Sequence, residues 1–175
     1  MTEITFERHS GKQALANLED MADLYIDARS ESPDEHDEMF SRPSFIARTD
    51  KQARETGFEL VTANSDAGLV GFSFGYTFRP GVWWGDATPP PREILDSGKL
   101  AVIELDVRKS YQRQGIGKRL IQELLAGRKE KYATLAATPD SPAHSMYLRL
   151  GWHKIGEFVT PPVMDAMIIP LSQSE

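Results

Sequence analysis

One short segment in the second half of the chain has the residue types and spacing of a ligand site. It runs from Leu105 to Lys118, LDVRKSYQRQGIGK, and has Gly115 and Gly117 near its end. Its first residues are strand-like, a polar turn follows, and an amphipathic helix is expected from about Gly115. A helix N-terminus presents unpaired amides and the positive end of a dipole, and glycine lets a backbone approach a ligand closely. The segment therefore predicts a site for a phosphate or pyrophosphate group.

Two common phosphate-binding motifs do not fit this segment. The Walker A motif requires a glycine, four residues and then Gly-Lys-Ser or Gly-Lys-Thr, and neither the spacing nor the hydroxyl is present. The dinucleotide-binding fingerprint requires a third glycine three residues after Gly117, where this chain has Leu120. Gln112, Gly115 and Gly117 instead match the pattern Gln/Arg-x-x-Gly-x-Gly/Ala. The alternative is that the glycines only form a tight turn between a strand and a helix.

A tyrosine motif follows further along the chain. Residues 147–152 read YLRLGW, a tyrosine followed by Leu-Gly and an aromatic residue. With both motifs in strand and helix contexts, residues 99–156 resemble the cofactor-binding core of the GNAT (GCN5-related) N-acetyltransferases. The resemblance implies an acyltransferase that moves an acetyl group directly from the thioester of acetyl-CoA, its cosubstrate, to a primary amine. It also implies one domain, residues 1–175, with the α/β (α+β) acyl-CoA N-acyltransferase fold: a mixed central sheet of about seven strands with helices on both faces.

The resemblance places the cofactor on the glycine segment. The backbone amides from Arg113 to Lys118 would hold the CoA pyrophosphate, and Gln112 would begin that turn. The main chain of Leu105 and Val107 would pair with the pantetheine arm as a strand pairs with a sheet edge. The amide of Leu105 would donate to the thioester oxygen, which gains negative charge during attack. The expected cofactor-binding residues here are Leu105, Asp106, Val107, Gln112, Arg113, Gln114, Gly115, Ile116, Gly117 and Lys118.

One position departs from the family pattern. Many members carry an asparagine seven residues before the tyrosine, where it contacts the cofactor arm, and this chain has Asp140 there. An ionised carboxylate cannot donate the hydrogen bond that an amide donates. Ser141 or Ser145 is therefore expected to contact the cofactor arm instead.

Acetyl transfer requires two proton movements, and two catalytic residues are expected to carry them. An alkylamine, with a reference pKa of about 10.4, is mostly protonated at neutral pH, so a base or a water chain must remove a proton before attack. Glu104 stands where relatives that act on small amines often carry an acidic residue; the alternative is a carboxylate paired with a neighbouring strand or loop. Asp106 lies on the same face of the strand and is a second candidate. Tyr147 matches the acid of the family, which protonates the departing thiolate; the alternative is a core tyrosine packed at a helix end.

The acceptor side is expected in the segments where the family varies, residues 10–56 and 80–98. Glu31 opens an acidic run, and Trp83 and Trp84 stand in a long segment rich in Gly and Pro. The expected acceptor-binding residues are these three, because a carboxylate attracts a cation and indoles can wall a pocket or stack on the cation. The alternatives are a solvated acidic loop, and tryptophans that fold the segment onto the sheet or form a dimer contact.

The expected acceptor is the primary amine of a small molecule. Two other functions stay open: acetylation of a protein, on lysine or the N-terminus, and a non-catalytic module that binds acyl-CoA without turnover. The formal net charge of -6 argues against nucleic acid as a partner, and no apolar run approaches the roughly 20 residues of a membrane span. The chain has no cysteine and its histidines lack metal-ligand spacing, so no metal is expected. We expect a cytoplasmic protein, with a homodimer as an open alternative.

The elements that must position these residues follow from the periodicity of apolar residues. The expected order is strand, helix, helix, hairpin, strand, helix, strand, helix, strand, strand. Helical spacing predicts one helix over residues 11–29, with a capping box at its start. A second helical region is expected between residues 34 and 55, interrupted by Pro43, and a third helix from about 115 to 129. The strand–helix–strand–helix order in the middle predicts a mixed sheet with helices on its faces.

Overall fold

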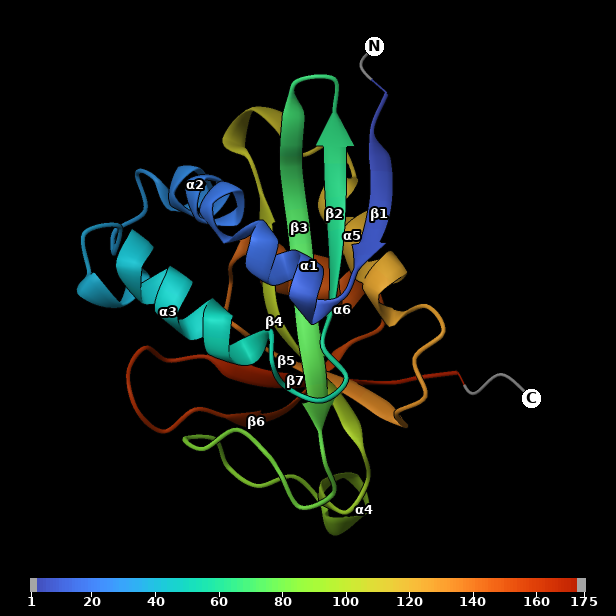
Figure 1. Ribbon diagram of the computed structural model, residues 1–175. Helices are drawn as coiled ribbons and strands as arrows, with labels where there is room; N and C mark the ends of the chain where they lie inside the picture. Colours follow the sequence, from blue (N-terminus) through green and yellow to red (C-terminus); the bar gives the residue numbers. More distant parts are fainter. Residues whose placement is uncertain (1–2, 173–175) are drawn as a thin grey trace. The chain divides into compact units, whose positions relative to one another are not determined.

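A computed structural model describes residues 3–172 of the chain (Figure 1). The strands are β1 (Thr5–His9), β2 (Glu59–Ser65), β3 (Gly68–Phe78), β4 (Lys99–Val107), β5 (Tyr132–Ala137), β6 (His153–Glu157) and β7 (Asp165–Pro170). The helices are α1 (Gly11–Ala16), α2 (Leu18–Arg29), α3 (Arg42–Gln52), α4 (Arg92–Leu95), α5 (Ile116–Leu125) and α6 (Pro142–Arg149), with 3-10 turns η1 (Glu38–Phe40) and η2 (Lys109–Tyr111). The predicted order of strands and helices is confirmed except that the first helix is divided in two, and the structure adds α4 within the long loop.

The strands form a mixed sheet with the hydrogen-bonded order β1-β2-β3-β4-β5-β7-β6. β4 and β5 run parallel, with Lys99–Ala101 beside Tyr132–Thr134. The pairs β1–β2, β2–β3, β5–β7 and β6–β7 are antiparallel. A parallel pair needs a crossover connection, and the connection from β4 to β5 contains α5. The expected seven-stranded mixed sheet of the α/β class is therefore confirmed.

Contacts within the chain divide it into two compact units. One unit contains Met1–Tyr76 and Glu104–Leu124, and the other contains Thr77–Ile103 and Leu125–Glu175. The glycine segment and Glu104 therefore belong to the first unit. Tyr147 and the two expected acceptor tryptophans belong to the second. Within residues 3–172, no helix is both long and apolar enough to cross a membrane.

In the first unit, helices cover both faces of the sheet. Figure 1 shows α1, α2 and α3 on one face, where aromatic rings connect α2 and α3 to β3. The ring of Tyr25 stacks 4.4 Å from that of Phe45, which lies 6.2 Å from the ring of Phe72. On the other face, α5 packs so close to β3 that a Cβ atom on Gly71 would lie 3.0 Å from Leu120. A larger residue at Gly71 would therefore push α5 away from the strand that supports it.

The structure corrects the first predicted helix. Residues 11–29 form two helices, α1 and α2, which meet at Asn17. The amide of Asn17 donates to the carbonyl of Ala14, and its side chain donates to the carbonyl of Gln13 at 2.8 Å. Asparagine competes with helical bonding in this way, so the helix breaks there. The capping box of Ser10 and Gln13 at the start of α1 is confirmed.

Pro43 begins a helix where the sequence predicted an interruption. Ser41 caps α3 by accepting a hydrogen bond from the amide of Ser44, and Pro43 lies in the first turn. An amide in the first turn has no partner within the helix, so proline loses nothing there. The helical region expected over residues 34–55 is therefore shorter. The predicted third helix also ends early, at Leu125, and Gly127 then adopts a positive φ of 75°.

Candidate active site

The turn between β4 and α5 has the backbone of an anion-binding nest. Arg113 and Gly115 have positive φ angles of 65° and 81°, and such alternation turns successive amides toward one side. Within the described part of the chain, no protein group accepts a hydrogen bond from the amides of residues 113–118. The last three of these residues begin α5, where amides lack intrahelical partners. The turn therefore offers several free donors at a helix N-terminus, as a phosphate or pyrophosphate requires.

Side chains tie this turn to the strands beside it. Gln112 Nε2 donates to the carbonyl of Val107 at 2.9 Å, which connects the start of the turn to the end of β4. Arg108 donates from its amide to the carbonyl of Val70 and from Nε to the carbonyl of Leu69, both at 2.8 Å. Gln112, part of the glycine motif, thus positions the turn through the backbone of β4.

Replacing Gln112 by alanine is expected to weaken CoA binding about fivefold, because the loss of one hydrogen bond costs about 1 kcal/mol. Calorimetric titration with CoA measures this change. Gln114→Ala is the matched control, since Gln114 is expected to contribute only its backbone amide, which alanine keeps, and its side chain is exposed. An equal loss of affinity in both variants would contradict a positioning role for Gln112.

Gly117 leaves room beside the end of β4. A Cβ atom there would lie 3.9 Å from side-chain atoms of both Leu105 and Val107, which is ordinary contact. Gly117 therefore needs no unusual backbone conformation, and its packing would tolerate a methyl group. The absence of a side chain at Gly117 keeps the space next to Leu105 and Val107 free. These are the two strand residues expected to pair with the pantetheine arm.

The connection that precedes the turn contacts α2 and the acidic run. Asp27 accepts a hydrogen bond from the amide of Lys109 at 3.0 Å. Lys109 Nζ forms an ion pair with Glu31 at 2.8 Å, and this hydrogen bond and charge lower the pKa of Glu31. Glu31, an expected acceptor-binding residue, thus lies against the residue that begins η2. The sequence did not predict this pairing, because the two residues are far apart along the chain.

Glu104 and Asp106 project from one face of β4, as the alternation of the strand predicted. Burial raises the pKa of Glu104, while hydrogen bonding with Asp106 and the charges of Arg48 and Arg29 oppose the rise. Burial and then the negative charge of Glu104 raise the pKa of Asp106 well above its ordinary value. A carboxylate with a raised pKa is a better proton acceptor, so this face of β4 is suited to general-base chemistry.

Three residues near Glu104 were not predicted as part of the site: Tyr25 and Arg29 of α2, and Arg48 of α3. Burial, followed by the charge of Glu104, raises the pKa of Tyr25 to about 12. Arg48 Nη2 donates to the Tyr25 hydroxyl at 3.3 Å, and the Arg29 guanidinium lies 5.3 Å from the Tyr25 ring centroid. In the sequence, Tyr25 only continues the apolar face of the helix predicted over residues 11–29. A tyrosine on an apolar helix face was the signal that could have pointed to a polar cluster there, because a buried tyrosine hydroxyl needs a polar partner.

In the second unit, α6 carries the expected acid. Tyr147 is 6% exposed, and its ring lies 5.7 Å from that of Trp152. Ser141 accepts a hydrogen bond from the amide of His144 at 3.1 Å, so its hydroxyl serves as the predicted N-cap of α6. Ser145 is exposed on the same helix. The structure thus places both serines and Tyr147 on or beside one short helix.

The two tryptophans of the long loop are bonded within the second unit. Trp84 Nε1 donates to Thr134 Oγ1 on β5 at 3.0 Å, and its ring meets that of Phe78 edge-on at 4.9 Å. Trp83 Nε1 donates to the carbonyl of Thr88 at 3.2 Å. These contacts favour the alternative in which the tryptophans fold the loop onto the sheet.

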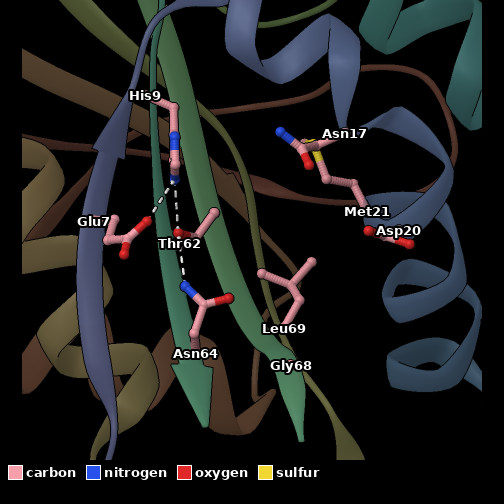
Figure 2. A pocket seen from close by; sticks show the side chains of 9 residues that line it. All are labelled: Glu7, His9, Asn17, Asp20, Met21, Thr62, Asn64, Gly68 and Leu69. Atoms are coloured by element: carbon pink, nitrogen blue, oxygen red, sulfur yellow. Dashed lines mark hydrogen bonds and ion pairs between the residues drawn. The ribbon is translucent and has the colours of Figure 1, made fainter. Parts of the chain in front are cut away.

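A hollow of about 290 Å³ lies in the first unit between α1, α2 and the first strands (Figure 2). Its lining residues are Glu7, His9, Asn17, Asp20, Met21, Thr62, Asn64, Gly68 and Leu69. Thr62 Oγ1 is bonded to His9 Nε2 at 2.9 Å and accepts from Asn64 Nδ2 at 3.1 Å. The lining contains no expected site residue, so the hollow adds no group to the predicted chemistry. Among residues 3–172, no group of three His, Cys, Asp or Glu side chains could hold a metal ion.

The mixed sheet is the fold of solved acetyltransferase structures. A histone acetyltransferase HPA2 and related acetyltransferase from Corynebacterium glutamicum is 19% identical, with a TM-score of 0.69 and 99% of each chain covered. Arabidopsis thaliana NAA60, solved with a bisubstrate analogue, is 14% identical over 98% of this chain and all of that chain, with a TM-score of 0.67. The PaiA N-acetyltransferase of Thermoplasma acidophilum, solved in complex with coenzyme A, is 15% identical, with a TM-score of 0.62 over 96% of this chain and 99% of that one.

The sequence also matches a family profile. The profile of the acetyltransferase (GNAT) family covers residues 18–152, so the chain belongs to this family of N-acetyltransferases. A curated relative, the GCN5-like protein acetyltransferase Rv2170 of Mycobacterium tuberculosis, is 31% identical over 118 residues. That match covers 59% of this chain and 57% of the relative, so the chain spans little more than half the length of the relative. The resemblance stated from the two motifs is thus confirmed.

Proposed function

We propose that this protein is an acetyl-CoA-dependent N-acetyltransferase that transfers acetyl directly from the thioester to a primary amine of a small molecule. The observation that carries the proposal is the nest at the start of α5, with its free amides from residue 113 to 118. Family membership supports it, and so does the coenzyme A bound in the similarly folded PaiA protein. In this proposal the amides bind the pyrophosphate, and the main chain of Leu105 and Val107 binds the pantetheine arm.

The proposed chemistry assigns one proton step to each catalytic residue. The carboxylate of Glu104 accepts a proton from the ammonium form of the substrate, directly or through water, and so generates the nucleophilic amine. The amine attacks the thioester carbonyl while the amide of Leu105 stabilises the oxyanion. The C–S bond then breaks, and the Tyr147 hydroxyl gives its proton to the departing thiolate. The second proton of the nitrogen restores the phenol, and the proton on Glu104 leaves to solvent.

Acetylation of a protein is the second candidate for this site. The curated relative is described as a protein acetyltransferase, and one similar structure is that of NAA60 with a bisubstrate analogue. A small-molecule acceptor stays our first choice because of the acidic character of the chain. A cytoplasmic location and a homodimer stay predictions from the sequence.

A thiol-release screen tests the proposed reaction. Purified protein is mixed with acetyl-CoA and a panel of diamines, polyamines, amino sugars, amino acids and peptides, and free CoA is measured. Amine-dependent release is the expected result, strongest with small cationic amines. Release with peptides alone would favour protein acetylation, and no release with any amine would favour a non-catalytic acyl-CoA-binding module.

Tyr147→Phe is expected to lower kcat about tenfold without changing the affinity for CoA. The effect is below the range of about 100- to 10,000-fold that is usual for acid catalysis, because a thiol with a pKa of about 8.5 leaves readily as the thiolate. The phenyl ring preserves the packing against Trp152, so stability measured by thermal melting should change little. Tyr132→Phe, on β5, is the control. An unchanged kcat in Tyr147→Phe would remove the acid assignment.

A further inference from the structure

Glu104 and Asp106 differ in how far each residue is exposed. Glu104 is half-buried, and it is the carboxylate that meets the substrate in the proposed function, whereas Asp106 is 8% exposed. Strand alternation places both side chains on one face of β4, and a hydrogen bond between the two carboxyl groups opposes the rise that burial causes in the pKa of Glu104 and adds to the rise in the pKa of Asp106. Asp106 Oδ2 is fully buried, and no N–H or O–H donor in the described part of the chain reaches it. An ionised Asp106 would therefore keep a buried, unsatisfied negative charge next to a second carboxylate, which is costly.

We propose that Asp106 is a positioning residue that holds a proton at neutral pH and donates it in a hydrogen bond to the ionised carboxylate of Glu104. One bond then satisfies the hydroxyl of a buried carboxylic acid and fixes the rotamer of the carboxylate that meets the substrate. The proposal rests on the proposed function, in which Glu104 is the general base. It adds that the base is a pair of carboxyl groups sharing one proton and one negative charge.

The charges around the pair support this distribution. From α2 and α3, the positive charges of Arg29 and Arg48 oppose the rise that burial causes in the pKa of both carboxyl groups. After burial, the charges of the two carboxyl groups in turn help to raise the pKa of Tyr25. The guanidinium of Arg48 donates to Tyr25 and to the carbonyl of Met39. Among the described residues, neither Arg29 nor Arg48 donates a hydrogen bond to either carboxyl group. Their positive charges thus favour one ionised carboxylate at a distance, and Asp106 is left as its hydrogen-bond donor.

The chemistry explains why Glu104 is the ionised group of the pair. Two adjacent buried carboxyl groups cannot both ionise at low cost, so the pair retains one proton. Burial raises both pKa values, and the neighbouring charge of Glu104 raises the pKa of Asp106 further. Glu104 consequently stays free to accept the proton of the ammonium substrate. When Glu104 takes up the proton of the substrate, Asp106 keeps its own proton. No third group then has to accept the Asp106 proton.

Two substitutions at Asp106 separate this arrangement from a purely structural one. Asp106→Asn keeps a neutral donor of the same shape, so the acid limb of the kcat/KM–pH profile is expected to stay within a few tenths of a pH unit of wild type. Asp106→Leu removes the donor, so the acid limb should move to higher pH by about one unit, the size of one hydrogen bond to a charged group. If Asp106 were ionised in the native protein, Asp106→Asn would instead move the limb downward. That shift, or an unmoved limb in Asp106→Leu, overturns the proposal.

A measurement without turnover tests the protonation directly. A buried carboxyl group with a raised pKa retains a proton that the unfolded chain releases above about pH 4, so its contribution to stability is lost as pH rises. Asp106→Asn removes this loss, and its melting temperature relative to wild type is expected to increase steadily from pH 4 to pH 9. A constant difference would contradict a protonated Asp106. Carbon-13 NMR titration of the Asp106 side chain in the wild-type chain provides the same information if a variant folds poorly.

The outcomes distinguish this proposal from the proposed function. Loss of turnover in Glu104→Gln, together with a downward shift in Asp106→Asn, keeps the acetyltransferase and removes the shared proton. A pH-dependent gain in stability for Asp106→Asn, in a protein that acetylates no amine, keeps the shared proton and removes the proposed reaction. Asp50→Asn, on the exposed Asp50–Arg54 pair of α3, is the control for loss of a carboxylate and should show neither effect.

Discussion

Gly117→Trp is expected to lower the affinity for CoA by more than about 100-fold, a loss of about 2.7 kcal/mol of binding free energy. The indole would start beside Leu105 and Val107, where a Cβ atom already lies at 3.9 Å from both side chains. It would fill the space through which the pantetheine arm passes in the proposed complex. It would also stand over the free amides at the start of α5. Calorimetric titration of the protein with CoA measures the effect.

Two glycine variants control for damage to the fold. Gly117→Ala adds only a methyl group at ordinary contact distance, so its CoA affinity should stay within a few fold of wild type. Gly85→Trp adds the same indole in the second unit, at a position with no atom within 4 Å of the new Cβ, and should bind CoA normally. A folded Gly117→Trp protein with wild-type affinity would show that the cofactor binds elsewhere.

Glu104→Gln is expected to lower kcat/KM for the amine by about 100-fold or more at neutral pH, within the range for the loss of a general base. The amide is nearly isosteric but cannot accept the ammonium proton in the required way. Wild-type activity should fall as pH decreases through the pKa of Glu104, which burial raises, because only the ionised carboxylate accepts a proton. The variant should lose this acid limb.

The affinity for CoA separates this effect from general damage. The amides of the nest are untouched in Glu104→Gln, so titration should give the wild-type affinity for CoA. Ser73 Oγ bonds the main-chain carbonyl of Glu104 at 2.7 Å, which keeps β4 in register whatever side chain is present. Equal activity of Glu104→Gln and wild type at every pH would assign the proton transfer to water or to another residue.

Several local features of the fold were predictable because their causes are local. The reciprocal hydrogen bonds of Ser10 and Gln13, and the Ser141 cap before Pro142, depend only on residues a few positions apart. The glycine motif predicted a turn at the start of a helix, and the alternation of β4 placed Glu104 and Asp106 on one face. The break at Asn17 was missed, because apolar spacing continues across it while a side-chain hydrogen bond decides the backbone.

The sequence by itself determined the family, most of the order of the elements and the position of the glycine turn before α5, since these depend on motifs and on periodicity along the chain. Only the tertiary structure decided what surrounds the carboxyl group of Glu104. The charges of Arg29 and Arg48 act on Glu104 because α2 and α3, whose aromatic rings stack on each other, pack against β3. Asp106 on the same strand is buried. Burial and neighbouring charges set a pKa, and both arise from residues that are distant in the sequence. The protonation of the carboxyl pair is therefore a property of the folded chain.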